Sequence, residues 1–485
     1  ETDVTMHFKI LFGALLFGAR ASAEAECQDL DNCPHCYNNT QPDYDPNDPS
    51  GLVVSDDLVA FMDNTMNEYL RLVQTVYPPS QYDSDATVFN GLGGRALLYL
   101  RLYDGDGDAD NLQIALEYIE SSLSSVNTIT SNYCGFLWGR TGVYSVAAAI
   151  YDRLNNTAKV QEMVTQVVNI FEASQSDSQA PYDDWDAGRG GLLFASPYLD
   201  RNTPNYQKAY NVNGGIISRE LMVNIATAVV NRGNKLSDAP GQYLQWVSPN
   251  DGGKWLGQSH GSAGVLHGLL LVPEVYIDNA TARGLILGTL DHIVSLQQPS
   301  GNFPTEYYNP SDDVLVQWDH GAPGVMAVLS EAAYRYSNTS NTDAKKEANT
   351  TSWMNSAIKA ADCTWERGLL VKGLQLCHGI SGNTYMQITL AQWLSRLNDN
   401  DCDNCETVCD ESNNNDCDPN KYIWRAIQFQ NFVSVSPDVS DPEYMRKPTP
   451  NPYEFYTASY EAGAVTFGDL IANAETPIRS TMPLY

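Results

Sequence analysis

Six segments of the chain repeat one arrangement of polar and apolar positions, in which a Gly-x-x-Gly motif opens a long apolar stretch. The apolar stretches, such as RALLYLRLY at 95–103 and VMAVLSEAAYRY at 325–336, lack the alternation of a strand and are typical of largely buried helices. A polar loop and a second stretch of helical periodicity follow, as in NLQIALEYIESSL at 111–123. Each unit is therefore predicted to be a helical hairpin. The six motifs begin at Gly91, Gly139, Gly188, Gly261, Gly321 and Gly379.

The spacing of these units favours a closed ring. Successive motifs begin 48, 49, 73, 60 and 58 residues apart, which is too irregular for an open solenoid of equal repeats. A degenerate seventh copy, which keeps only Gly463, is predicted at SYEAGAVTFGDLI (459–471). If the glycine-led helices line the inside of a ring, their N-termini all face one mouth, where unpaired N–H groups favour anions and thiolates. We predict an all-α fold over residues 61–475, an (α/α) toroid of about seven hairpins.

The N-terminal segment has the pattern of a targeting sequence. Within 6–25, His7 and Lys9 precede an apolar run from Ile10 to Ala19, and the small residues Ala21-Ser22-Ala23 follow. This predicts a secretory signal peptide cleaved near Ala23 or Ala25. A membrane anchor is the alternative, but the run is too short to span a bilayer. We expect a secreted, extracellular protein.

Cysteine usage agrees with export. Most of the ten cysteines cluster in an N-terminal arm at 26–60 and in an insertion at 399–420, and both clusters are predicted to be disulfide-stapled loops, with zinc knuckles as the lesser alternative. Five sequons predict N-linked glycans if the chain enters a eukaryotic secretory pathway. The sequon asparagines are Asn38, Asn155, Asn279, Asn338 and Asn349.

The charge of the chain excludes two classes of partner. Lys and Arg total 28 against 59 Asp and Glu, a net charge of −31, which repels nucleic-acid phosphates and anionic lipid. We therefore expect no nucleic-acid and no membrane partner. The alternating aspartates at 104–110 are of a calcium-binding (Ca2+) kind, but this segment lacks the glycine and glutamate of an EF-hand loop. A solvated acidic loop is the favoured interpretation.

Three of the motifs carry a histidine immediately before the first glycine: His260, His320 and His378. In a ring of equivalent units, equivalent positions lie at one height, so these side chains and their neighbours are expected to converge. The residues preceding His320 and His378 are Asp319 and Cys377, and carboxylate, thiolate and imidazole are all zinc ligands.

From about residue 85 to 472 the chain resembles the LanC-like family, the lanthionine synthetase cyclases and their eukaryotic homologues. The resemblance is densest in SGNFPTEYYNPSDDVLVQWDHGAPGV (300–325) and WERGLLVKGLQLCHGISGNTY (365–385). It implies a toroid of seven hairpins and a zinc ion (Zn2+) bound by two cysteines and a histidine. The zinc activates a thiol for addition to dehydroalanine or dehydrobutyrine, and eukaryotic members look like enzymes that add glutathione to such residues. The resemblance assigns Cys377 and His378 to the zinc set and His260 to acid–base catalysis.

The chain departs from the family at the first zinc cysteine. The family pattern is Trp-Cys-His-Gly-Ala-Pro-Gly, and this chain has Asp319 in place of the cysteine. A carboxylate still binds zinc with the same charge, but an oxygen ligand leaves a harder Lewis acid than a second thiolate does. Two hypotheses follow. One is a zinc-dependent thioether-forming enzyme acting on a small thiol or a peptide. The other is a non-catalytic extracellular glycoprotein, structural or ligand-binding, that assembles with other copies.

Five further residues are candidates for the site. Asp183, Asp184 and Asp186 precede the third motif, in a region where some bacterial cyclases use an aspartate, and Asp184 is the preferred catalytic position. Arg140 and Arg189 lie inside their motifs, where they would either bind the carboxylate of a ligand or serve as salt-bridged scaffolding.

The residues of the proposed zinc site also have simpler interpretations. Cys377 could form a disulfide with Cys363, and Asp319 could be a helix cap. His320 is expected to be structural and His267 to be a packing residue. A glycosidase would need two opposed carboxylates, for which Asp319 and Asp184 are the candidates.

Overall fold

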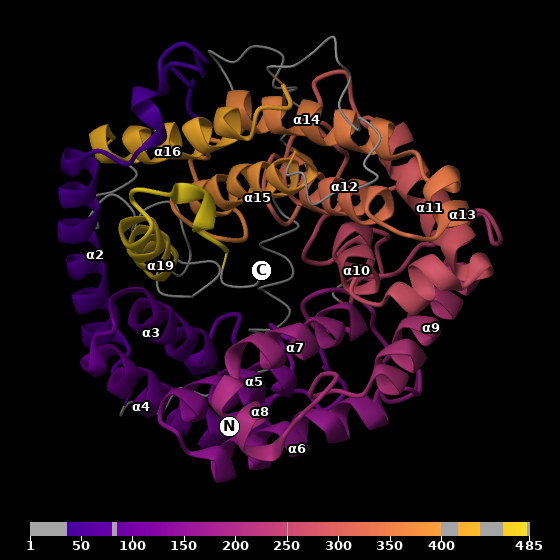
Figure 1. Ribbon diagram of the computed structural model, residues 1–485, viewed down its shortest axis with the longest axis horizontal. Coiled ribbons are helices and arrows are strands. Elements are labelled where there is room, and N and C mark those ends of the chain that lie inside the picture. The colour runs from indigo at the N-terminus through magenta and orange to yellow at the C-terminus, as the bar shows by residue number, and fades with distance from the viewer. Residues whose placement is uncertain (1–35, 80–84, 250, 399–415, 437–458, 483–485) are drawn as a thin grey trace, which may run out of the picture.

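The computed structural model describes residues 36–79, 85–249, 251–398, 416–436 and 459–482, which form two concentric layers of helices (Figure 1). The inner layer consists of α3 (Leu92–Asp106), α5 (Arg140–Arg153), α7 (Arg189–Asn202), α10 (Ser262–Leu269), α12 (Ala322–Ser337), α15 (Ile380–Asn398) and α19 (Ser459–Ala472). The outer layer consists of α2 (Asp56–Val76), α4 (Ala109–Ser125), α6 (Thr157–Ala173), α9 (Arg219–Leu236), α11 (Ala280–Ser295), α14 (Thr350–Arg367) and α16 (Pro419–Val435). Two short helices, α8 (Pro204–Tyr210) and α13 (Thr342–Glu347), lie in connecting segments.

The ring is closed by the ends of the chain. Helix α19, the predicted seventh copy, packs against both α2 and α3 (Figure 1). No strand occurs within the described ranges, which contain only two isolated β-bridges. The predicted all-α toroid is therefore confirmed.

The two layers differ in burial, as their sequences predict. Helix α15 buries every position from Ile380 to Ala391, because α12 and α16 cover it on two sides. The outer helix α4 buries only one stripe, which includes Leu112, Ala115 and Ile119, and leaves its other positions partly or fully exposed. Uniformly apolar segments thus become inner helices and amphipathic segments become outer ones.

The glycine motifs are explained by close backbone contacts. A Cβ atom at the second glycine of a motif would overlap the carbonyl oxygen six residues earlier, for instance that of Phe136 at Gly142 or of Gln258 at Gly264. The chain therefore folds back tightly over the start of each inner helix. Gly321 also has a φ of 100°, a conformation that other residues rarely adopt.

The predicted boundaries correspond only in part to structural elements. Helix α2 begins at Asp56, so the ring starts inside the predicted arm of 26–60. The described part of the arm crosses α16, where Trp424 Nε1 donates to the Pro42 carbonyl at 2.9 Å. The segment predicted to be a signal peptide (6–25) and most of the predicted insertion at 399–420 lie outside the described residues. No helix of the described chain is both long enough and apolar enough to cross a membrane.

Candidate active site

The loops before three inner helices meet at one place. His260 precedes α10, Asp319 precedes α12, and Cys377 and His378 precede α15. The Asp319 N–H donates to the Cys377 carbonyl oxygen at 3.1 Å, which joins the second loop to the third. The first loop reaches the second at Gly257, where a Cβ atom would overlap the Asp319 carbonyl. Equivalent positions of neighbouring hairpins therefore converge, as the repeat predicts.

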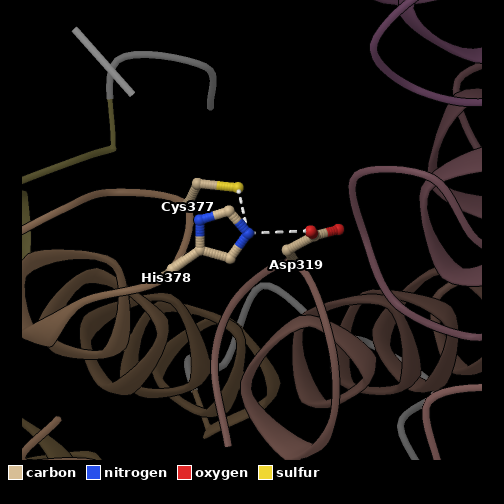
Figure 2. Close-up of side chains that lie close together, drawn as sticks. All are labelled: Asp319, Cys377 and His378. Atoms are coloured by element: carbon tan, nitrogen blue, oxygen red, sulfur yellow. Dashed lines mark hydrogen bonds and ion pairs between the residues drawn. The ribbon is translucent and has the colours of Figure 1, made fainter. Parts of the chain in front are cut away.

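Asp319, Cys377 and His378 form a cluster of potential metal ligands (Figure 2). One ligand atom from each residue lies within 4.8 Å of the others. His378 Nε2 lies 3.0 Å from Asp319 Oδ2 and 3.4 Å from Cys377 Sγ. Within the described ranges this is the one group of three such residues. Catalytic zinc sites have three protein ligands of N, O or S type, and this cluster offers one of each.

The surroundings of the cluster keep two of the potential ligands, His378 and Asp319, in the protonation state that binds a metal ion. Burial lowers the pKa of His378 to about 4, so its imidazole is neutral at physiological pH. Burial by itself would raise the pKa of Asp319, but His320 and His378 hold it well below its usual range. Asp319 Oδ1 is buried and has no hydrogen-bond partner, which leaves it available to a cation. These residues therefore fit zinc.

Cys377, the third potential ligand, must lose its thiol proton before it can bind a metal ion. Burial, together with the Asp319 carboxylate, raises the pKa of the Cys377 thiol well above its usual value. A metal ion would replace this proton, because the thiolate is the form that binds metal.

His260 lies beside the cluster, in a cage of carboxylates. Its Nδ1 is 3.5 Å from Asp184 Oδ2 and 3.6 Å from Asp186 Oδ2. Burial opposes protonation of His260, but Asp186, Asp184 and Asp319 outweigh it and raise the pKa of His260 to about 10. Burial also raises the pKa of Asp186, to about 7. His260 is thus protonated, as an imidazolium, at neutral pH.

Sequence reasoning missed the residue that connects His260 to the cluster. The Ser259 hydroxyl donates to Asp186 Oδ2 at 2.5 Å and also lies within hydrogen-bonding reach of the Cys377 thiol. Ser259 occupies the same position in the repeat as Asp319 and Cys377, two residues before the first motif glycine. This shared position is the sequence feature that indicates Ser259 as a site residue. From the sequence, Asp184 is favoured over Asp186 as the catalytic position. In the structure both carboxylates face His260.

The two arginine candidates lie elsewhere. Arg189 is fully buried, and its Nε lies 2.6 Å from Asp183 Oδ1. Arg140 donates to the Ile129 carbonyl at 3.1 Å. Neither guanidinium belongs to the cluster of Asp319, Cys377 and His378. The buried ion pair of Arg189 with Asp183 agrees with the alternative prediction, that these arginines form structural salt bridges.

The other histidines have structural contacts. His267 Nε2 lies 3.2 Å from Glu331 Oε2, and its ring packs 4.7 Å from that of Trp185. His320 Nε2 lies 3.0 Å from Asp319 Oδ2, so this histidine supports the carboxylate.

One alternative is wrong. Cys363 and Cys377 are both buried free thiols, so they do not form a disulfide with each other. Cys377 instead faces His378.

The aspartates at 104–110 serve local structure. Asp104 pairs with Arg153 at 2.9 Å, and Asp108 accepts the Asp110 N–H at the start of α4. These contacts give both carboxylates a structural role.

Comparison with known proteins decides the family. The family described as lanthionine synthetase C-like protein matches residues 82–423, most of the ring. The chain belongs to this family. It is 27% identical over 301 residues to a zebrafish (Danio rerio) protein named glutathione S-transferase LANCL1, covering 62% of this chain and 68% of that one. It is also 27% identical over 314 residues to LanC-like protein GCL1 of Arabidopsis thaliana, covering 63% and 66% of the two chains.

A pH-dependent stability effect is expected at His260 of this LanC-like protein. Because the pKa of His260 is raised to about 10, its ion pair with Asp184 stabilises the fold from below the unfolded-state pKa of roughly 6.5, and its pair with Asp186 adds to this above about pH 7, where that carboxyl is ionised. The stabilisation is lost as the pH rises through 10. His260→Asn should therefore lower the free energy of unfolding of the metal-free protein at pH 6 and have less effect near pH 10. Urea denaturation across this range measures the difference. If His260→Asn changed the free energy of unfolding by the same amount at every pH, His260 would not be the positively charged group proposed here.

Proposed function

We propose that this LanC-like protein is a zinc-dependent enzyme that adds a thiol, of glutathione or a peptide cysteine, to dehydrated amino-acid residues. The observation that carries the proposal is the juxtaposition of the Asp319, Cys377 and His378 cluster with the charged His260. The printed name of the zebrafish relative, a glutathione S-transferase, supports the same class of reaction.

The residues have distinct roles in this proposal. Asp319, Cys377 and His378 hold the zinc ion, which when bound lowers the pKa of a substrate thiol. The thiol proton leaves to solvent, and the sulfur forms a bond to the β-carbon of the dehydrated residue. The electron pair of the carbon–carbon double bond moves to the α-carbon, which takes a proton from His260. His260 then regains a proton from solvent, while Asp184 and Asp186 hold it in its charged form.

Asp319 tunes the proposed reaction. An oxygen ligand donates less electron density than a thiolate, so a thiol bound here would be more acidic and less nucleophilic than with two cysteine ligands. We therefore propose slower thiol addition than a Cys, Cys, His set would give.

A second candidate is a non-catalytic extracellular glycoprotein, structural or ligand-binding, that assembles with other copies. The observation in its favour is that all five sequon asparagines are exposed. We propose export and glycosylation under either hypothesis.

Thiol addition tests the proposed function directly. Zinc-loaded protein incubated with glutathione and a dehydroalanine peptide is expected to give the thioether adduct, detected by mass spectrometry. His260→Ala should slow the reaction about 100-fold or more, because a positioned proton donor contributes at least that much, and it should leave the zinc content intact. His292→Ala is the matched control, since His292 stacks on Tyr243 in the outer layer. Absence of the adduct from protein that holds one zinc per chain would favour the second candidate.

A further inference from the structure

Three aspartates at the site share one feature that the proposed mechanism does not use. Oδ2 of each has a partner within the protein: the Ala187 N–H for Asp184, the Ser259 hydroxyl for Asp186, and His378 for Asp319. Oδ1 of each is buried and has no hydrogen-bond partner. Asp319 Oδ1 belongs with the metal cluster. Asp184 and Asp186 belong to no group of three potential metal ligands among the described residues.

Asp184 and Asp186 also lack a full complement of positive charge. Both are at most 1% exposed, and a buried carboxylate needs a cation or several donors. Among the ion pairs of the described residues, neither carboxylate pairs with a lysine or arginine, and their shared cation is His260. Their neighbour Asp183 is different, because it pairs with Arg189 and Arg232.

An aromatic ring completes this subsite. Trp138 is half-buried, and its ring centroid lies 5.2 Å from that of His260. The Trp138 backbone N–H donates to the Asp186 carbonyl at 3.0 Å, which places Trp138 next to Asp186, and an indole face attracts organic cations, ammonium groups included.

We propose that Asp184 and Asp186, with Trp138, bind a primary ammonium group of the substrate, so that the preferred thiol substrate is an aminothiol. This inference rests on the proposed function, because it places the ammonium beside the thiol site. The ammonium supplies the N–H donors that the two Oδ1 atoms lack, and Ser259, which contacts both Asp186 and Cys377, connects this subsite to the metal cluster.

Binding of two matched thiols tests this inference. Isothermal titration calorimetry of zinc-loaded protein with cysteamine and with N-acetylcysteamine compares a charged amine with a neutral amide on the same thiol. Cysteamine should bind about tenfold or more tightly, the usual effect of a charge-assisted hydrogen bond. The double variant Asp184→Asn, Asp186→Asn should bind the two thiols equally. Asp63→Asn, on the exposed surface of α2, is the control and should keep the preference.

The outcomes separate this inference from the proposed function. Equal binding of both thiols by the unmodified protein would keep the thiol site and overturn the ammonium subsite. A preference that persists in the double variant would also overturn it, because the amine would then be bound elsewhere, for instance at the zinc. Binding of neither thiol would overturn the proposed function together with the inference. If the double variant does not fold, the single variants Asp184→Asn and Asp186→Asn replace it, and each should reduce the preference for cysteamine.

Discussion

Replacing Cys377 by alanine is expected to abolish stoichiometric zinc binding. The purified protein should contain one zinc per chain, because Asp319, Cys377 and His378 place an oxygen, a sulfur and a nitrogen within 4.8 Å of one another. Without the sulfur only two ligands remain, and the affinity should fall by more than the roughly 10- to 100-fold that loss of a mere supporting residue costs. Elemental analysis after dialysis, followed by competition with a chelator, measures both quantities.

The matched control for this variant is Cys363→Ala. Cys363 is also a buried free cysteine, but it lies in α14, outside the metal cluster, and burial raises its pKa to about 12. Its replacement should leave the zinc content unchanged. Asp319→Cys should strengthen zinc binding, since it restores the two-cysteine set that the family resemblance implies. Zinc retained by Cys377→Ala would contradict the site.

The pH dependence of zinc affinity provides an independent check. Because the pKa of Cys377 is raised well above its usual value, zinc must displace a proton at neutral pH. Zinc affinity should therefore increase with pH across the neutral range, and binding should release a proton that is measurable as a buffer-dependent heat. In Cys377→Ala this proton release should disappear.

Replacing Gly142 by alanine is expected to destabilise the ring by about 3 kcal/mol, the upper part of the range for overpacking a well-packed core. A Cβ atom there would overlap the Phe136 carbonyl oxygen and contact the Val88 side chain. The loop cannot move away easily, because the Phe136 ring packs 5.1 Å from Phe194 and 4.9 Å from Tyr198. Urea denaturation followed by circular dichroism measures the change.

Gly284→Ala is the control for this effect. Gly284 lies in α11, and a Cβ atom there would meet nothing within 4 Å. Since alanine favours a helix over glycine by about 1 kcal/mol, this variant should be as stable as the unmodified protein or more stable. Equal destabilisation by both substitutions would show that the motif glycines are not required for close backbone contact.

The repeat predicted the parts of the site that depend on register. His260, Asp319, Cys377 and His378 all lie at or next to the position before a motif glycine, so a closed ring brings them together whatever the details of packing. Single side chains were harder to predict. Arg189 shares the motif, but its guanidinium is drawn to Asp183 in the protein interior, since an ion pair compensates for burial of its charge.

The choice among neighbouring aspartates also depended on packing. Asp183, Asp184 and Asp186 are nearly adjacent in the chain, yet Asp183 pairs with arginines while the other two face His260. No periodicity distinguishes them, because they lie in a loop whose course is set by contacts with other hairpins. The link through Ser259 likewise exists only because the loops before α7, α10 and α15 meet.

The sequence by itself determined the helical hairpins and the ring, because these follow from local periodicity and glycine spacing, and the family resemblance implied that Asp319 replaces a zinc cysteine. Only the tertiary structure decided which charges share a partner. The tertiary structure shows that Cys363 and Cys377 do not form a disulfide. It also shows that His260 lies beside two carboxylates, those of Asp184 and Asp186. Burial removes water from these groups, so their pKa values and ion pairs depend on neighbours that lie far away in the chain.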